Sequence, residues 1–287
     1  MKRLTHLPAH CIIKSSKAAK RKAHTMFDLV IDTETAPMRK VPMQLMAANS
    51  LVYDMGGVVR DTKTGEIVHS FSFIIADTFY NNTMMQSAYY AQKLPQYHEG
   101  VTKGLWISVS FKYAYDYIHS IIAQYGIKTV WAYNAQFDMA TLNNTINHYS
   151  NGWITEFFPS HITVKDVWTR CANITGTKKY VSYCIDNGYL TDKGNPKTSA
   201  EIVYRYLTQN HDFIEAHTAL NDAEIEAFIL TCAQKNKKKA MKGIGRGYKM
   251  AADMAKSMHH ISTTKKKPAK SKGKLFYNME TRKWDYR

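Results

Sequence analysis

Cysteine and proline are scarce in this chain of 287 residues, which contains four cysteines and seven prolines. The cysteines form no C-x-x-C pair and no zinc-like spacing, so neither a disulfide framework nor a zinc site is predicted. No apolar run approaches the roughly 20 residues that a membrane-spanning helix needs. With a hydrophobic content of 45%, the sequence predicts a soluble globular protein of a reducing compartment.

Acidic residues are nearly missing from both ends of the chain. Residues 1–24 carry seven Lys and Arg and no acid, and residues 235–287 carry 17 Lys and Arg against three acids. The segment 25–234 holds 15 basic and 20 acidic residues, within a total net charge of +16. Lysine-rich segments neutralise phosphates and release counterions, which is typical of chains that bind a polyanion. A solvated tail kept for solubility is the alternative.

The charge pattern predicts three parts. Residues 1–25 form a basic N-terminal extension, 26–234 one folded domain, and 235–287 a basic, largely disordered C-terminal tail. The N-terminal extension lacks the continuous apolar stretch of a secretory signal, so secretion is not expected. It fits either a transit peptide or a flexible arm, and Met26 offers an alternative translation start.

Strands and helices alternate along the folded domain after an initial run of strands. An apolar run at 27–31 followed by acids predicts a buried strand, and two further strands joined at Gly65 predict a β-hairpin. Helical and strand patterns then succeed one another at 111–126, 127–133, 137–149, 198–208 and 221–235. This order predicts a mixed α/β sheet flanked by helices.

More detailed predictions concern residues 78–105 and the starts of two helices. Residues 78–105 show no clear period and predict an irregular, Tyr-rich insertion with at most a short helix, whose aromatic side chains either stack on bases or pack internally. Capping patterns predict that one helix begins at Thr198 or Ser199, and that the last begins at Asn221 with Glu224 three residues later.

Acidic side chains stand at the ends of three predicted elements. In the first strand, Asp32 and Glu34 project from the same face, about 6.5–7 Å apart at their Cα atoms. Such a pair can share divalent cations, although acids at strand ends also cap loops. Asp138 and Asp222 stand in the first turns of helices, where the helix dipole favours an acid. His217 precedes the last helix, as a surface residue or as a general base.

Three short motifs carry these residues in order: DTET at 32–35, NAQFD at 134–138 and EAHTALNDA at 215–223. Together they resemble the three exonuclease motifs of the DEDDh branch of the DEDD superfamily, in which the third motif is H-x-x-x-x-D. This DnaQ-like branch includes polymerase proofreading subunits, RNase T and oligoribonuclease. The resemblance covers roughly residues 27–232. It implies a ribonuclease H-like α/β fold, with a five-stranded mixed sheet flanked by helices.

The resemblance also implies a chemistry: 3′-5′ hydrolysis of phosphodiester bonds in DNA or RNA, at single-stranded ends, releasing nucleoside monophosphates. Asp32, Glu34, Asp138 and Asp222 would bind two Mg²⁺ or Mn²⁺ ions, and His217 would be the general base. Carboxylate oxygens suit these hard cations, and paired metals stabilise both the attacking and the leaving oxygen. A histidine with a pKa near 6.5 can accept a proton from water at neutral pH.

Substrate and partners follow from the same resemblance. Thr35, Asn134 and Phe137, within the first two motifs, are expected to contact single-stranded DNA or RNA. A proofreading role would require a separate polymerase partner, and no membrane partner is expected. The compact size and lysine-rich ends suggest the cytoplasm of a bacterium or of a phage-infected cell. The alternative function is a nucleic-acid-binding module with weak or no nuclease activity.

Overall fold

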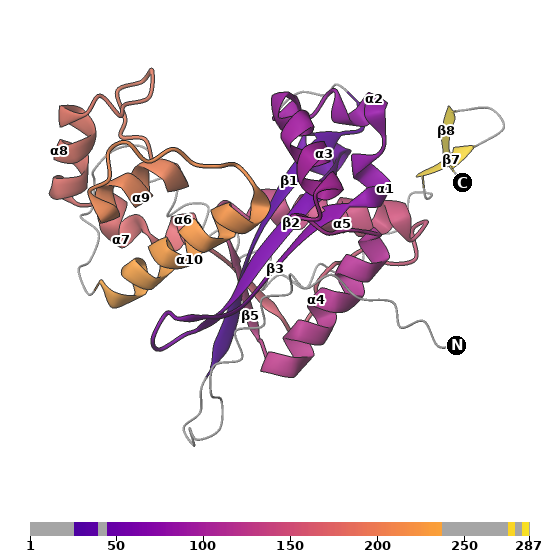
Figure 1. Ribbon diagram of the computed structural model, residues 1–287, viewed down its shortest axis with the longest axis horizontal. Coiled ribbons are helices and arrows are strands. Elements are labelled where there is room, and N and C mark those ends of the chain that lie inside the picture. The colour runs from indigo at the N-terminus through magenta and orange to yellow at the C-terminus, as the bar shows by residue number, and fades with distance from the viewer. Residues whose placement is uncertain (1–25, 40–44, 237–274, 279–282, 287) are drawn as a thin grey trace. The chain divides into compact units, whose positions relative to one another are not determined.

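A six-stranded mixed sheet forms the centre of the folded domain, in the order β4–β3–β2–β1–β5–β6. Figure 1 labels β1, β2, β3 and β5 of this sheet. The computed structural model describes residues 26–39, 45–236, 275–278 and 283–286. The predicted mixed α/β fold is confirmed, but the resemblance implied five strands and the sheet has six. The two-residue strand β4 leaves no periodic signal in the sequence. The strands are β1 Phe27–Pro37, β2 Ser50–Asp61, β3 Ile67–Ile75, β4 Ser108–Val109, β5 Thr129–Ala132 and β6 Thr163–Asp166.

The first three strands form an antiparallel meander that contains the predicted hairpin. β1 pairs with β2 along its whole length, and β2 pairs with β3. Every residue of β2 is buried. Gly65 takes a φ of 81° in the turn between β2 and β3, where a glycine adopts the left-handed conformation without steric cost. The long pairing fixes which side chains of β1 face each side of the sheet.

The other half of the sheet is parallel. β5 pairs in parallel with both β1 and β6. Helix α4, Phe111–Tyr125, precedes β5 and ends as predicted at Gly126, which has a φ of 61°. Helix α5, Ala135–Tyr149, follows β5. Because parallel strands end at the same edge of a sheet, the residues after β5 lie beside the end of β1.

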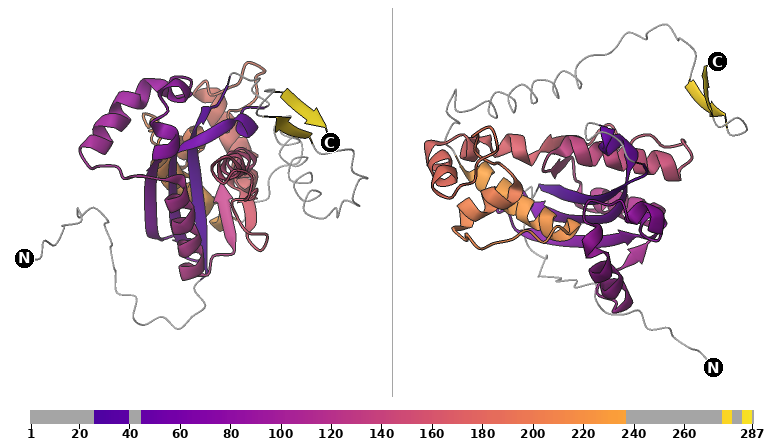
Figure 2. Two further views of the ribbon diagram at one scale, coloured as in Figure 1. Left: turned by 90° about the vertical axis from the view of Figure 1, so that its right-hand side faces the viewer. Right: turned by 90° about the horizontal axis from the view of Figure 1, so that it is seen from above.

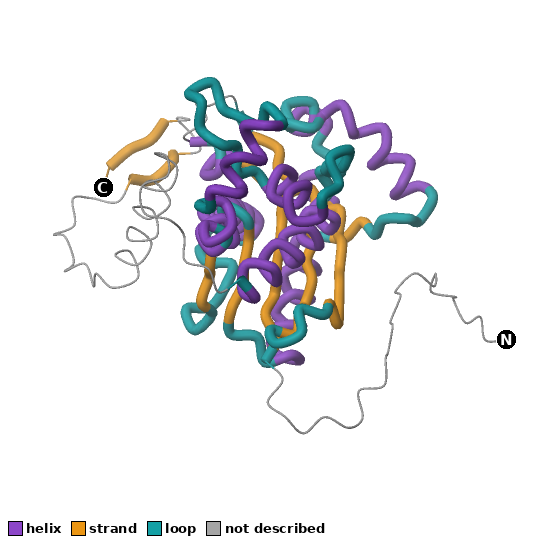
Figure 3. The backbone as a smooth tube through the Cα atoms, turned by 90° about the vertical axis from the view of Figure 1, so that its left-hand side faces the viewer, coloured by secondary structure: helices purple, strands orange, loops and turns teal. Residues whose placement is uncertain are grey.

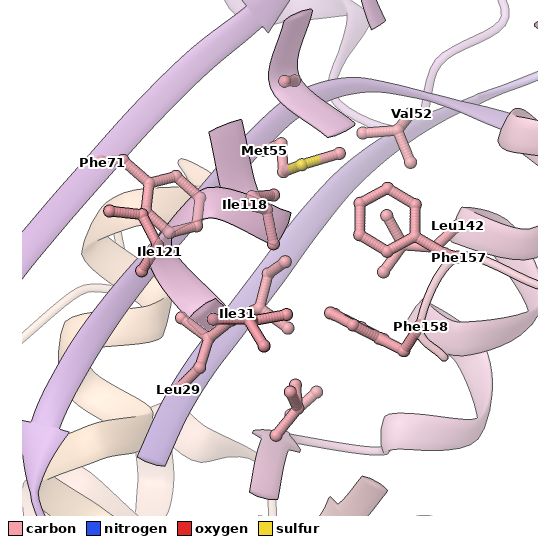
Figure 4. Packing of buried hydrophobic residues seen from close by; sticks show 14 of the residues in the cluster. Leu29, Ile31, Val52, Met55, Phe71, Ile118, Ile121, Leu142, Phe157 and Phe158 are labelled. Atoms are coloured by element: carbon pink, nitrogen blue, oxygen red, sulfur yellow. The ribbon is translucent and has the colours of Figure 1, made fainter. Parts of the chain in front are cut away.

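Helices cover both faces of the sheet (Figures 2 and 3). Leu29 and Ile31 of β1 pack in a hydrophobic cluster with side chains of α4 and α5 (Figure 4). Val30 belongs instead to the cluster on the opposite face, which contains the apolar side of helix α10, Ala219–Lys235. Since side chains of a strand alternate between faces, Asp32 and Glu34 continue the Val30 row on the α10 face.

The insertion at 78–105 is helical rather than irregular, so that prediction is wrong. It contains helix α2, Asn82–Met85, the 3₁₀ helix Ala91–Lys93 and helix α3, Leu94–Thr102, and follows helix α1, Ala76–Phe79. Its short helices have no sustained hydrophobic period, and their stability comes from packing. Phe79, Met85 and Tyr97 form a third buried cluster with Tyr53 and Ile74 of the sheet.

A second group of short helices lies between β6 and α10. They are α6 Val167–Arg170, α7 Ala172–Thr175, α8 Lys178–Asp186 and α9 Ala200–Thr208. The predicted helix at 198–208 is present, with Ser199 at its N-cap, although the side chain of Ser199 makes no capping hydrogen bond. A short 3₁₀ helix, Ala47–Asn49, precedes β2.

A buried ion pair joins the sheet to α10. Arg60 donates from Nε and Nη2 to the carboxylate of Asp28 at 3.0 and 2.7 Å, and from Nη1 to the hydroxyl of Thr231 at 2.8 Å. The indole of Trp131 donates to the same carboxylate at 3.0 Å. The side chain of Arg60 is 0% exposed, so this ion pair is tolerated because both of its charged groups are hydrogen-bonded.

A separate unit, residues 249–287, contains two antiparallel strands, β7 Leu275–Asn278 and β8 Lys283–Tyr286. The predicted N-terminal extension 1–25 and most of the predicted tail 235–287 lie outside the described residues, and the three-part division stays a prediction. Among the described residues, no helix combines the length and apolar content that a transmembrane span requires.

Candidate active site

The first two candidate residues lie at the end of β1 on the face that α10 covers. Glu34 is 9% exposed and Asp32 is partly exposed. The pairing of β1 with β2 shifts register between Glu34 and Thr35, so Glu34 is the last residue before the irregularity, opposite Asp54. This bulge ends the regular alternation beyond the two acids.

Asp138 reaches the same edge of the sheet from α5. It lies in the first turn of this helix and is 3% exposed. The hydroxyl of Thr33, on the opposite face of β1 from Asp32, donates to Oδ1 of Asp138 at 2.9 Å. Asn134 at the N-cap of α5 has a left-handed φ of 64°, which turns the chain sharply from β5 into the helix. The turn brings Asp138 to the end of β1.

His217 and Asp222 approach from the start of α10. Nδ1 of His217 is 3.9 Å from Oδ2 of Asp222 and 3.6 Å from Oε2 of Glu215. Ligand atoms of Glu34, His217 and Asp222 all lie within 4.8 Å of one another. His217 has a left-handed φ of 50°, which is uncommon for a residue other than glycine. The fold thus brings together residues from the first and third motifs.

The predicted start of the last helix at Asn221 is wrong. Helix α10 begins at Ala219, with Thr218 at the N-cap and no side-chain capping bond from Thr218. The backbone N–H of Ala219 donates instead to Oδ2 of Asp54, on β2, at 3.1 Å. A carboxylate from a distant strand therefore takes the place of a local cap, which a local sequence pattern does not reveal.

The proximity of the four predicted carboxylates is electrostatically unfavourable. Burial raises the pKa of Glu34 to about 9, of Asp222 to about 8 and of Asp138 to about 7. Desolvation also raises the pKa of Asp32 well above its ordinary value, and the carboxylates of Glu226, Asp138, Asp222 and Glu34 raise it further. Burial and mutual repulsion therefore favour the protonated forms of these groups in the absence of cations.

The pKa of His217 is shifted in the opposite direction, downward. Burial lowers its pKa, the ammonium of Lys93 lowers it further, and Glu201 opposes the shift. The side chain is 29% exposed. At neutral pH the ring is therefore uncharged and can accept a proton.

Two further acidic residues lie beside the predicted carboxylates and were not predicted from the sequence. Glu226 lies one helical turn after Asp222 on α10, is 3% exposed, and accepts the backbone N–H of Tyr133 at 3.1 Å. Burial, followed by Asp138 and Asp222, raises its pKa well above the ordinary value. The spacing of Asp222 and Glu226 in DAEIE was a signal, since residues four apart share a helix face.

Asp54 is the second unpredicted acid. It is 2% exposed, and burial raises its pKa to about 6, against hydrogen bonds that lower it. Its carboxylate is the second-largest cause, after burial, of the raised pKa of Glu34. The hairpin pattern placed Asp54 on a strand, but only the pairing register of β1 and β2 shows that it faces Glu34.

The three predicted substrate contacts lie around these groups. Thr35 directly follows Glu34 past the bulge and is half-buried. Asn134 is exposed, and its carbonyl accepts the backbone N–H of Phe137 at 2.8 Å in the turn that opens α5. Phe137 is half-buried. Their role in substrate binding stays a prediction.

The residues present fit divalent cations. Oδ1 of Asp222 and Oδ1 of Asp54 are buried and have no hydrogen-bond partner among the residues that the structure describes. Crowded carboxylates with unsatisfied oxygens are unfavourable unless a positive charge compensates them. Oxygen donors of this kind are the ligands that Mg²⁺ and Mn²⁺ prefer.

Comparisons with known proteins bear on the fold. No family model and no curated protein matches the sequence. Among solved structures, a full-length 3′-exonuclease matches with a TM-score of 0.50 at 12% identity, over 76% of this chain and 85% of that one.

Two further matches are slightly weaker. One is the nuclease domain of 3′hExo, a DEDDh family member bound to rAMP, with a TM-score of 0.49 at 12% identity over 77% and 98% of the two chains. The other is cell-death related nuclease 4, with a TM-score of 0.49 at 14% identity over 75% and 66%.

These likenesses concern the fold. The chain shares the mixed α/β architecture of that full-length 3′-exonuclease, a sheet flanked by helices, as the order of its strands and helices predicted. The identity is too low for the activity to be transferred with the fold.

Proposed function

We propose that this chain is a metal-dependent 3′-5′ exonuclease that hydrolyses phosphodiester bonds of DNA or RNA at single-stranded ends. The supporting observation is that Glu34, His217 and Asp222, far apart in sequence, have ligand atoms within 4.8 Å of one another. Asp32 and Asp138 couple electrostatically to the same group. A structural role for five such groups would leave their mutual repulsion uncompensated.

Asp32, Glu34, Asp138 and Asp222 are proposed to hold two divalent ions, Mg²⁺ or Mn²⁺. When bound, such ions would stabilise negative charge on the attacking and leaving oxygens of the phosphodiester. The buried oxygen of Asp222 that lacks a donor, and the raised pKa values of Glu34 and Asp138, favour cation binding at this place.

His217 is proposed to take the proton of the attacking water. Its Nδ1 lies 3.6 Å from Oε2 of Glu215 and 3.9 Å from Oδ2 of Asp222, and we propose that the neutral ring keeps its proton on Nδ1 and offers the lone pair of Nε2. The water oxygen then bonds to phosphorus, and the bond from phosphorus to the 3′ oxygen of the preceding nucleotide breaks. The products are a nucleoside 5′-monophosphate and a strand with a new 3′ hydroxyl.

The test measures mononucleotide release, followed as stepwise shortening of 5′-labelled single-stranded DNA, single-stranded RNA and duplexes, with Mn²⁺ present. Asp32→Asn keeps the shape of the side chain but removes the charge, and should lower the rate by about 10³-fold or more, equivalent to several kcal/mol of transition-state stabilisation. The matched control is Asp116→Asn, whose exposed carboxylate pairs with Lys112 on α4. Release by the control should equal that of the wild type.

Two results would contradict the proposal. One is the absence of mononucleotide release from every substrate. The other is equal release by the wild type and Asp32→Asn. In the first case, retained binding of labelled strands would favour the alternative of a nucleic-acid-binding module.

A further inference from the structure

The insertion, residues 78–105, lies against the segment that carries His217. The ring of Tyr90 stacks on the imidazole of His217, with centroids 4.5 Å apart and an angle of 18° between the ring planes. Tyr90 comes directly before the 3₁₀ helix Ala91–Lys93. One face of the histidine ring is therefore covered by the insertion.

Lys93 holds the backbone of the same segment. Its Nζ donates to the carbonyl oxygen of Ala216, and lies 3.5 Å from the carbonyl oxygen of His217. The ammonium also lies 4.9 Å from the ring centroid of Tyr90. One side chain of the insertion thus contacts the histidine ring, and a second contacts the peptide groups on both sides of the His217 Cα.

A third contact anchors the insertion to the residues that follow. The hydroxyl of Tyr97, in α3, donates to Oδ2 of Asp54 at 2.7 Å, and the same oxygen accepts the N–H of Ala219 at 3.1 Å. Tyr97 is 1% exposed within the third buried cluster. The insertion is therefore fixed to the sheet and to the start of α10 together.

These contacts matter because the backbone of His217 is in an unfavourable conformation. Its φ of 50° lies in the left-handed region, which a residue with a side chain adopts only when its surroundings hold it there. Residues 213–218 belong to no helix or strand. Tyr90 and Lys93 contact this loop from the insertion.

We propose that the insertion is a positioning element for the catalytic histidine, and that Tyr90 and Lys93 act through His217. The inference rests on the proposed function, because it assigns His217 the role of general base. It differs from a base-stacking role for Tyr90, since the imidazole occupies one face of the Tyr90 ring. The ring of Tyr89 also lies perpendicular to it, with the centroids 4.8 Å apart.

The first test does not depend on nuclease activity. Hydrogen exchange of the peptide that spans residues 213–220 and carbethoxylation of His217 by diethyl pyrocarbonate are both followed by mass spectrometry. Tyr90→Ala and Lys93→Met should each accelerate both processes, roughly threefold or more, because the loop opens more often. Tyr90→Phe, which retains the ring, should restore the rates of the wild type.

Matched controls separate this effect from general loosening. Lys103→Met removes an exposed lysine of the same insertion that pairs with Glu99. Trp153→Ala removes an aromatic side chain that is 90% exposed. His211, which contacts Tyr183 rather than the insertion, serves as an internal reference for carbethoxylation. Exchange and modification should be unchanged in both control variants and at His211.

The second test uses turnover. Tyr90→Ala and Lys93→Met should lower kcat about 10- to 100-fold with a smaller change in KM, because a base displaced by about 1 Å loses rate rather than substrate affinity. An increase in KM at constant kcat for Tyr90→Ala would show that Tyr90 binds substrate, and would overturn the inference.

The two proposals fail in different ways. If the wild type releases no nucleotide, the proposed function is wrong, while exchange and modification still decide whether the insertion restrains the loop. If exchange and modification in Tyr90→Ala and Lys93→Met match the wild type, the positioning role is wrong, while the nuclease activity of the wild type stands.

Discussion

Glu226 illustrates how a single buried charge can shape this site. After burial, its carboxylate is the largest cause of the raised pKa of Asp32, and its own pKa is raised well above the ordinary value. A group whose pKa is higher in the folded than in the unfolded state binds more protons when folded. Its contribution to stability is therefore lost as the pH rises above the ordinary pKa of a glutamate.

At the residue scale, Glu226→Gln should stabilise the metal-free protein. Glutamine keeps an oxygen that can accept the N–H of Tyr133 but removes the charge. At pH 8 in the presence of a chelator, the free energy of unfolding in urea should rise by about 1–2 kcal/mol, and the gain should shrink as the pH falls to 5. A gain that is independent of pH would argue against a charge effect.

The start of helix α10 packs closely against strand β2 at Gly56. A Cβ at Gly56 of β2 would lie 2.1 Å from the backbone nitrogen of Leu220 and 2.3 Å from the carbonyl carbon of Ala219. Both atoms are backbone and cannot move unless the helix moves. Since Ala219 also donates to Asp54, the start of α10 is held at one place on β2 by a hydrogen bond and by the absence of a side chain.

At the scale of this element, Gly56→Ala should displace the start of α10, which carries Asp222. We expect a loss of about 1–3 kcal/mol in the free energy of unfolding, and a loss of nucleotide release at temperatures where the variant stays folded. The control is Gly188→Ala, where a Cβ meets open space but φ is +69°. It should lose about 1 kcal/mol through its backbone conformation and retain activity.

The whole folded domain responds to pH through the same acids. Glu34, Asp138 and Asp222 have pKa values raised to about 9, 7 and 8 in the folded state. The folded protein therefore binds more protons than the unfolded chain between about pH 4 and pH 9, and its free energy of unfolding should fall as the pH rises through this window.

Urea denaturation at pH 6, 7 and 8 in a chelator checks this expectation, with a total loss of up to about 6 kcal/mol anticipated from these three groups. Mn²⁺ at pH 8 should reverse the loss, because ions that bind only the folded protein stabilise it. Asp138→Asn should show a shallower dependence on pH. A stability that rises from pH 6 to pH 8 without metal would contradict the assignment of the raised pKa values.

The charge division of the chain leads to a prediction for the entire molecule. Residues 235–287 hold 17 Lys and Arg against three acids. Truncation after Asn236 preserves the hydrogen bonds of Asn236 with Asn173, at 2.9 and 3.1 Å, which close the end of α10. In a chelator, the truncated chain should bind single-stranded DNA more weakly and with a lower dependence on salt.

Hydrolysis of a dinucleotide distinguishes a role in nucleic-acid binding of the residues after Asn236 from a role in catalysis. The truncated chain should hydrolyse it at close to the rate of the full chain, because a dinucleotide offers too few phosphates for a lysine-rich segment to bind strongly. Equal affinity and equal salt dependence before and after truncation would exclude a nucleic-acid-binding role for the segment.

Local patterns predicted the longer strands and helices in their order and located the three motifs, but missed β4 and the short helices of residues 78–105. Alternation along 27–35 placed Asp32 and Glu34 on one face, and Gly65 and Gly126 marked a turn and a helix end, because these features depend on neighbouring residues. The division of charge between the ends and the middle of the chain is likewise a property of the sequence alone.

The contacts between residues far apart in the sequence are visible only in the tertiary structure. The opposition of Asp54 and Glu34 depends on the register of β1 and β2, and the start of α10 at Ala219 depends on a carboxylate of β2. The stacking of Tyr90 on His217 joins the insertion to a loop more than a hundred residues later. Such contacts follow from packing between distant segments, for which local periodicity and capping rules carry no information.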